Sequence, residues 1–324
     1  MPKLKKRNVK RILLITLISG FIAINFVAFF HAYAFTHFSE SGQDKTSHPE
    51  RLSFGAKLKI LIFGVSNPRP KAKHPAPATY QTIRLQSNYA IECWYSAKAD
   101  NPLLKDSVKG AVAIFHGYGA EKSGMLDKAA LFDSLGYDVL LVDFMGCGGS
   151  EGNSTSIGFH EASQVTTAFD FLAGKGYTDI YLFGSSMGAA AIMKAMQDDK
   201  LPVSGLILEC PFSTMYETVG ARFDNMHLPR FPMAGLLVFW GGVQNNFQAF
   251  KHNPEDYAKA ITAPTLLMIG GQDKNVSMPA TQSIFNQLNG EKQLKVYLLA
   301  GHENYLNKYR SAWINDVSFF MKKP

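Results

Sequence analysis

A turn between a strand and a helix is the feature of this sequence that most restricts its fold. The run Ile180–Phe183 is continuously apolar, as buried strands are, and Ala189–Met196 has the composition of a helix. Between them stands Gly184-Ser185-Ser186-Met187-Gly188. Glycine permits a tight turn with close approach of neighbouring backbone, which a Cβ would obstruct. The pattern predicts an elbow that projects Ser186, with the positive end of the helix dipole beneath it.

The rest of the chain after Tyr80 alternates short apolar runs with helical stretches. The predicted strands are Thr79–Leu85, Ile91–Tyr95, Ala111–His116, Val139–Asp143, Ile180–Phe183, Gly205–Glu209, Thr265–Ile269 and Leu294–Leu299. The predicted helices are Lys122–Leu135, Glu161–Ala173, Met187–Gln197, Pro279–Leu288 and Asn304–Met321. Two opening strands followed by this alternation indicate an α/β fold with a mostly parallel, eight-stranded sheet covered on both faces. The alternation lapses between Pro211 and Ala260, and an insertion of that length is expected to form a short helical cap.

A serine hydroxyl is a poor nucleophile near neutral pH and needs a positioned base. Where the nucleophile stands on such an elbow, an acid and then a histidine follow it along the chain. His302 is the only histidine after residue 252, and it lies directly after a predicted strand. Asp273 also follows a strand, and we expect it to orient the imidazole of His302. Glu209, after the preceding strand, is the alternative acid.

The negative charge that develops on a substrate oxygen during attack by a serine needs hydrogen-bond donors. His116-Gly117-Tyr118-Gly119 follows a predicted strand at the place where one backbone N–H is expected. We assign that donor to Tyr118 and the second donor to Met187, next to the nucleophile. His116 precedes Ser186 in the chain, and we interpret it as structural.

With these motifs the chain resembles the α/β-hydrolase superfamily, in its serine-aminopeptidase-like and monoacylglycerol-lipase-like branch. The resemblance covers Tyr80 to the C-terminus. It includes Asp143–Gly152 (DFMGCGGSEG), which is similar to the D-x-R-G-x-G-x-S-x-G loop of that branch, with Met145 where arginine is usual. The resemblance implies a serine hydrolase, but one fold hosts esterases, lipases, thioesterases and peptidases.

The N-terminal segment predicts a membrane helix. Ile12–Phe35 contains no Asp, Glu, Lys or Arg, and as a helix it would reach roughly 36 Å, enough to cross a hydrocarbon core of about 30 Å. Residues 1–11 carry six basic side chains, which favours a cytoplasmic N-terminus and a catalytic domain on the far side. A cleaved signal peptide is the alternative, because Ala32-Tyr33-Ala34 resembles a cleavage site.

These segments divide the chain into a basic terminus, a signal-anchor helix, a linker and a hydrolase domain. Their predicted bounds are residues 1–11, 12–35, 36–78 and 79–324, with the cap at about 211–260. The linker assignment rests on its content of Ser, Lys, His and Pro.

Composition excludes some classes of protein. The formal charge of +7 comes from the N-terminal cluster, because the remainder holds 27 basic and 26 acidic residues, so nucleic-acid binding is not expected. Three widely spaced cysteines, Cys93, Cys147 and Cys210, form neither a disulfide framework nor a metal-ligand pattern. We therefore expect no metal and no cofactor.

The expected function is hydrolysis of small carboxylic esters, acyl or lipid-like, through an acyl-enzyme intermediate. The apolar stretch Phe231–Trp240 favours a greasy substrate portion, although these residues equally suit packing of the cap. A peptidase of the serine-aminopeptidase type is the enzymatic alternative, and a non-catalytic binding protein of the same fold is the other. The sequence does not predict an oligomeric state.

Overall fold

The computed structural model describes residues 6–40, 53–56, 60, 64, 66–101 and 107–322. Residues 1–5 of the basic terminus and most of the interior of the predicted linker lie outside this part of the chain.

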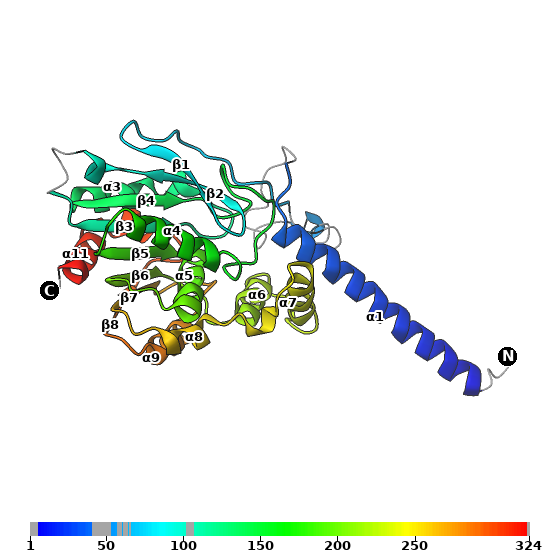
Figure 1. The fold of residues 1–324 in the computed structure, drawn as a ribbon. Helices are drawn as coiled ribbons and strands as arrows, with labels where there is room; N and C mark the ends of the chain where they lie inside the picture. Colours follow the sequence, from blue (N-terminus) through cyan, green and yellow to red (C-terminus); the bar gives the residue numbers. More distant parts are fainter. Residues whose placement is uncertain are drawn as a thin grey trace.

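The centre of the domain is an eight-stranded sheet in the order β1-β2-β4-β3-β5-β6-β7-β8 (Figure 1). β1 pairs antiparallel with β2 and β2 antiparallel with β4, and every other pairing is parallel. The strands are β1 Gln81–Gln86, β2 Ala90–Tyr95, β3 Gly110–Phe115, β4 Tyr137–Val142, β5 Ile180–Ser185, β6 Gly205–Glu209, β7 Thr265–Gly270 and β8 Lys292–Tyr297. The predicted fold class is confirmed. Because the inner strands are buried on both faces, they are mostly apolar, with the buried Asp138 in β4 and Glu209 at the end of β6 as charged exceptions.

Helices cover both faces of this sheet (Figure 1). On one face α3 meets α11, where the rings of Phe132 and Trp313 lie 6.2 Å apart between centroids. α4 and α5 pack together, and α5 follows directly on β5. The helices of this layer structure are α3 Leu126–Ser134, α4 Ala162–Gly174, α5 Met187–Asp199, α9 Met278–Gln287, α10 Tyr305–Lys308 and α11 Arg310–Met321.

The predicted C-terminal helix Asn304–Met321 is wrong as a single element. The structure has α10 and α11, separated at Tyr309, whose φ of −126° and ψ of 44° are not helical. The hydroxyl of Tyr309 accepts a hydrogen bond from the backbone N–H of Leu299 at 2.9 Å. Tyr309 is thus bonded to the segment after β8 at the point where the helix breaks. The local sequence does not predict this break.

The insertion between Pro211 and Ala260 is helical. It contains α6 Met215–Asn225, α7 Met233–Gln244 and α8 Pro254–Tyr257, with short 3-10 turns at Ala249–Lys251 and Ala258–Ala260. Thr214 caps α6 by accepting from the N–H of Glu217.

The N-terminal segment forms one helix, α1 Lys6–Thr36, which projects away from the domain (Figure 1). Asn8–Thr36 is long and apolar enough to be a candidate transmembrane span. The end of α1 nearer the domain packs on α7.

Both ends of the predicted linker are fastened to the domain. His37 forms an isolated β-bridge with Ser154, and Ser39 forms one with Pro68. Arg69 donates from Nη1 to the carbonyl of Gly152 at 2.6 Å. The composition of this region predicts a linker, and these contacts fasten its described ends to the domain.

Candidate active site

Ser186 stands at the turn between β5 and α5, as the elbow predicts. Its φ of 52° and ψ of −108° lie outside the conformations of ordinary strands and helices. The turn is held from both sides, because the N–H of Ser186 donates to the Glu209 carbonyl at 2.7 Å and its carbonyl accepts from Ala190 at 3.0 Å. A strained serine backbone of this kind is kept where the surrounding structure determines it.

The two glycines of the motif are required by close backbone approach. A Cβ on Gly184 would lie 2.6 Å from the backbone nitrogen of Ala189, and one on Gly188 would lie 2.5 Å from the carbonyl oxygen of Phe115. Real Cβ atoms essentially never approach backbone so closely. The elbow can therefore be this tight only with glycine at both positions.

His302 lies in the loop after β8, and its imidazole reaches Ser186. Its Nε2 is 3.1 Å from the Oγ of Ser186, and its Nδ1 is 2.7 Å from Oδ2 of Asp273. The order serine, acid, histidine that the sequence predicts is thus assembled in space by the ends of β5, β7 and β8.

Asp273 is held so that one carboxylate oxygen faces the histidine. Its Oδ1 accepts from the backbone N–H groups of Asn275 at 2.8 Å and Val276 at 2.9 Å. Its side chain is fully buried, and Oδ2 is left to meet His302. Burial of the imidazole lowers the pKa of His302, but the Cys210 sulfur and the Asp273 carboxylate outweigh this effect and raise that pKa well above its ordinary value.

Glu209, the alternative acid, is engaged elsewhere. Its carboxylate accepts a hydrogen bond from the indole N–H of Trp313 at 2.7 Å and lies 3.8 Å from Nζ of Lys128. Burial raises the pKa of Glu209. The structure brings Asp273, and not Glu209, to His302.

The His116–Gly119 loop packs against the elbow. A Cβ on Gly117 would lie 3.3 Å from the carbonyl oxygen of Ser185 and 3.5 Å from Cβ of Ser186, so the loop at Gly117 lies next to the serine. His116 is fully buried, and its Nε2 accepts from the N–H of Phe144 at 3.1 Å. This contact is consistent with the structural interpretation of His116.

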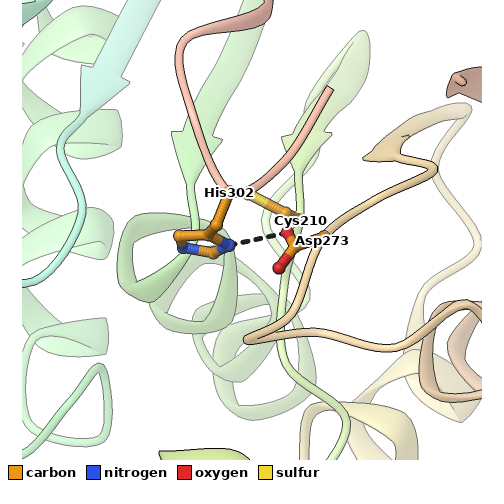
Figure 2. Close-up of side chains that lie close together, drawn as sticks. All are labelled: Cys210, Asp273 and His302. Atoms are coloured by element: carbon orange, nitrogen blue, oxygen red, sulfur yellow. Dashed lines mark hydrogen bonds and ion pairs between the residues drawn. The ribbon is translucent and has the colours of Figure 1, made fainter. Parts of the chain in front are cut away.

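Sequence reasoning missed Cys210 as a member of this site. It directly follows β6, with φ of 42°, and its sulfur lies within 4.8 Å of ligand atoms of both Asp273 and His302. Figure 2 shows the three side chains together. The signal was its position after a strand adjacent to β5, since the carboxyl ends of parallel strands meet at one edge. Both ring nitrogens of His302 already have partners in this group, since Nδ1 meets Asp273 and Nε2 meets Ser186.

The loop that resembles the family motif is held by a buried lysine. Nζ of Lys122 pairs with Oδ2 of Asp143 and lies 2.8 Å from Oε1 of Glu92. Lys122 and Asp143 are both fully buried. The ammonium group of Lys122 therefore supplies a positive charge to this loop, although Met145 occupies the usual arginine position.

A cavity of about 1310 Å³ lies beside His302, between the cap and the end of α1. Most of its lining is apolar. Apart from His302 and Tyr118, its walls include Ile157 from the segment before α4, Ala32 and Phe35 from α1, Met215, Val219 and Phe223 from α6, and Leu237, Val238 and Gly241 from α7. Sequence reasoning did not place α1 in this wall.

Phe35, near the end of α1, contacts Tyr118 and Arg222 at the cavity wall. Its ring stacks on Tyr118 with centroids 4.6 Å apart, and the guanidinium of Arg222 lies 4.6 Å from the centroid of the Phe35 ring. The hydroxyl of Tyr118 also donates to the carbonyl of Phe35 at 2.7 Å. The helix thus contacts the loop expected to supply a backbone donor.

Known proteins are similar to this chain in sequence or in fold. A family model described as serine aminopeptidase, S33, matches residues 106–255. An uncharacterized protein of Mycobacterium tuberculosis is 29% identical over 231 residues, which cover 69% of this chain and 72% of that protein. The lysophosphatidylserine lipase of Macaca fascicularis is 29% identical over 232 residues, 67% of this chain and 57% of the relative. Among solved structures, an esterase of Pyrococcus furiosus superposes with a TM-score of 0.63 at 18% identity, covering 79% of this chain and 98% of that one.

Proposed function

We propose that this chain, which is an α/β hydrolase and a serine hydrolase, cleaves carboxylic esters with Ser186 as nucleophile, His302 as general base and Asp273 as its orienting acid. The observation that carries the proposal is the hydrogen-bonded series from Ser186 through His302 to Asp273. Each contact has the length of an ordinary hydrogen bond, and each member stands at the carboxyl end of its own strand.

The chemistry follows from this geometry. With the proton of His302 on Nδ1, Nε2 can take the proton of Ser186 Oγ as the oxygen bonds to the ester carbonyl carbon. The tetrahedral intermediate collapses when the imidazolium returns that proton to the departing alkoxide, which leaves as an alcohol and forms the acyl-enzyme. Water, activated by the same Nε2, then attacks the acyl carbon and releases the acid and free Ser186.

We assign the two donors for the developing oxyanion to the backbone N–H groups of Tyr118 and Met187. Tyr118 follows Gly117, at which a Cβ would lie 3.5 Å from Cβ of Ser186. Met187 follows Ser186 directly and begins α5, whose dipole adds positive potential at that point. One such donor is typically worth about 10²–10³ in rate.

The cavity supports an acyl or lipid-like ester as the substrate. Its apolar lining from α1, α6 and α7 suits a hydrocarbon portion, and its volume is above that of most small-ligand sites, about 300–1000 Å³. The curated relatives include a lysophosphatidylserine lipase, and the solved neighbours include esterases. Peptide cleavage is the second candidate, favoured by the description of the matching family model.

We propose further that α1 is a retained anchor, with its N-terminus cytoplasmic and the domain on the far side. Removal of the chain through Ala34 would delete Ala32 from the cavity wall and leave Phe35 at a new terminus within the site. A helix that completes the site is better explained as part of the mature protein than as a leader. A product shortened by about 34 residues, seen by mass spectrometry, would refute this.

A substrate panel tests the reaction. Purified protein in detergent is offered esters of increasing acyl length, the matching thioesters and aminoacyl amides. We expect turnover of esters that increases with acyl length and is absent in Ser186→Ala. Turnover of amides alone would overturn ester hydrolysis in favour of the peptidase.

A further inference from the structure

The inner half of α1 is part of the folded domain. Nε1 of Trp240 in α7 donates to Oδ1 of Asn25 at 3.2 Å, and Nε2 of Gln244 donates to the carbonyl of Phe29 at 2.8 Å. The rings of Phe29 and Trp240 meet edge to face with centroids 5.3 Å apart. Ala28, between these contacts, is fully buried. From Asn25 onward, α1 therefore lies side by side with α7, so that both helices occupy the same depth along the axis of α1.

The apolar part of α1 before this contact is too short to cross a membrane. Ile12–Ile24 rises roughly 20 Å at 1.5 Å per residue, whereas the hydrocarbon core is about 30 Å thick. The aliphatic stems of Lys10 and Arg11 can extend the immersed length by a few ångströms. A shortfall of roughly 5–10 Å remains, and any tilt of the helix increases it. The bilayer must therefore reach the part of α1 that packs on α7.

The surface of α7 suits such contact. The helix contains no Asp, Glu, Lys or Arg, and its outward side chains Phe239 and Val243 are 48% and 54% exposed. Phe231 and Phe250, on either side of α7 in the chain, are exposed as well. In Figure 1 α7 stands directly beside α1. Helices that lie in a membrane interface are immersed by about 5–10 Å, which equals the shortfall of α1.

We propose that α7 is immersed in the leaflet on the side of the catalytic domain, and that the substrate enters the cavity from that leaflet. This inference rests on the proposed membrane anchor and ester hydrolysis. Leu237, Val238 and Gly241 of α7, together with Ala32 of α1, form part of the cavity wall. The helices that meet the bilayer therefore also bound the space beside His302, and an acyl chain has a short apolar path to it.

Spin labels on single introduced cysteines test the inference. The full chain is reconstituted in phosphatidylcholine vesicles after labelling of Phe239→Cys, Val243→Cys, Ile15→Cys and the control Phe319→Cys. Phe319 is 63% exposed on α11, which lies at the other end of the domain (Figure 1), and the three native cysteines are buried. Collisions of each label with oxygen, which concentrates in lipid, are compared with collisions with a water-soluble nickel chelate.

We expect the labels at 239, 243 and 15 to favour oxygen and the label at 319 to favour the nickel chelate. If 239 and 243 behave like 319 while 15 favours oxygen, the immersion of α7 is refuted and the anchor survives. If 15 also favours the chelate, both fail. Mutual broadening of the 239 labels with shielding from both reagents would refute the inference by placing a second copy of the chain on α7. Ester hydrolysis is measured in detergent, so its failure is recorded independently of the membrane contact.

Discussion

Replacement of Phe35 by alanine tests whether the end of α1 supports the chemistry. The Phe35 ring stacks on the Tyr118 ring with centroids 4.6 Å apart, and the guanidinium of Arg222 lies 4.6 Å from the centroid of the Phe35 ring. Phe35→Ala removes both ring contacts but keeps the carbonyl that accepts from the Tyr118 hydroxyl. We expect the loop that carries the backbone N–H of Tyr118 to be less firmly placed next to Ser186.

The size of the effect follows from the two contacts. An aromatic stack contributes about 0.5–1.5 kcal/mol, and a cation–π contact about 0.5–2 kcal/mol when partly desolvated. Together they amount to about 1–3.5 kcal/mol, which corresponds to roughly a 5- to 400-fold loss if all of it is felt at the transition state. Because the Tyr118 hydroxyl bond is retained, we expect a decrease in kcat/KM of roughly 5- to 30-fold.

The assay is hydrolysis of a water-soluble p-nitrophenyl ester in detergent, with circular dichroism to establish that each variant is folded. Phe30→Ala is the matched control, since Phe30 lies on the same helix with its ring exposed and outside the cavity. Unchanged kcat/KM in a folded Phe35→Ala would refute the role of α1 in the site. An equal loss in Phe30→Ala would show that the helix matters only for general stability.

Two further substitutions follow from the buried charges. Asp273→Asn removes the carboxylate that helps to raise the pKa of His302, so we expect kcat to fall by about 10⁴ and the acidic limb of the pH profile to move to lower pH. In the native protein that limb lies above pH 6.5, because the rate increases as pH rises through the raised pKa and His302 becomes neutral. Lys122→Met leaves Asp143 buried without its cation, and we expect it to lower the free energy of unfolding by about 3–5 kcal/mol in urea titrations. The control is Lys194→Met, which removes the more exposed ion pair with Asp198 and is expected to cost less than about 1 kcal/mol by the same measurement. A limb unmoved by Asp273→Asn, or equal losses in Lys122→Met and Lys194→Met, would contradict these assignments.

Much of the fold was readable from the sequence because its inner strands are buried on both faces. Each of the eight strands overlaps a predicted strand, with ends that agree within a few residues, although the edge strands β1 and β8 alternate apolar with polar residues. The elbow was readable for a different reason, since only glycine fits at Gly184 and Gly188. His302 and Asp273 were found by chain order combined with their positions after strands.

What the sequence did not reveal depends on contacts between distant segments. Cys210 reaches His302 only because β6 lies between β5 and β7. The end of α1 looks like any apolar helix, and nothing local to Phe35 indicates that Tyr118 and Arg222 enclose it. The break at Tyr309 likewise accompanies a hydrogen bond to the segment after β8.

The assignment of Ser186 as the nucleophile is tested most directly by covalent labelling. A fluorophosphonate reacts with an activated serine, and mass spectrometry of the digested protein locates the adduct. We expect one adduct at Ser186, loss of labelling in Ser186→Ala, and strong reduction in His302→Ala, while the neighbouring Ser185→Ala remains labelled at Ser186. A folded wild-type protein that is not labelled, or is labelled equally in Ser186→Ala, would contradict the account.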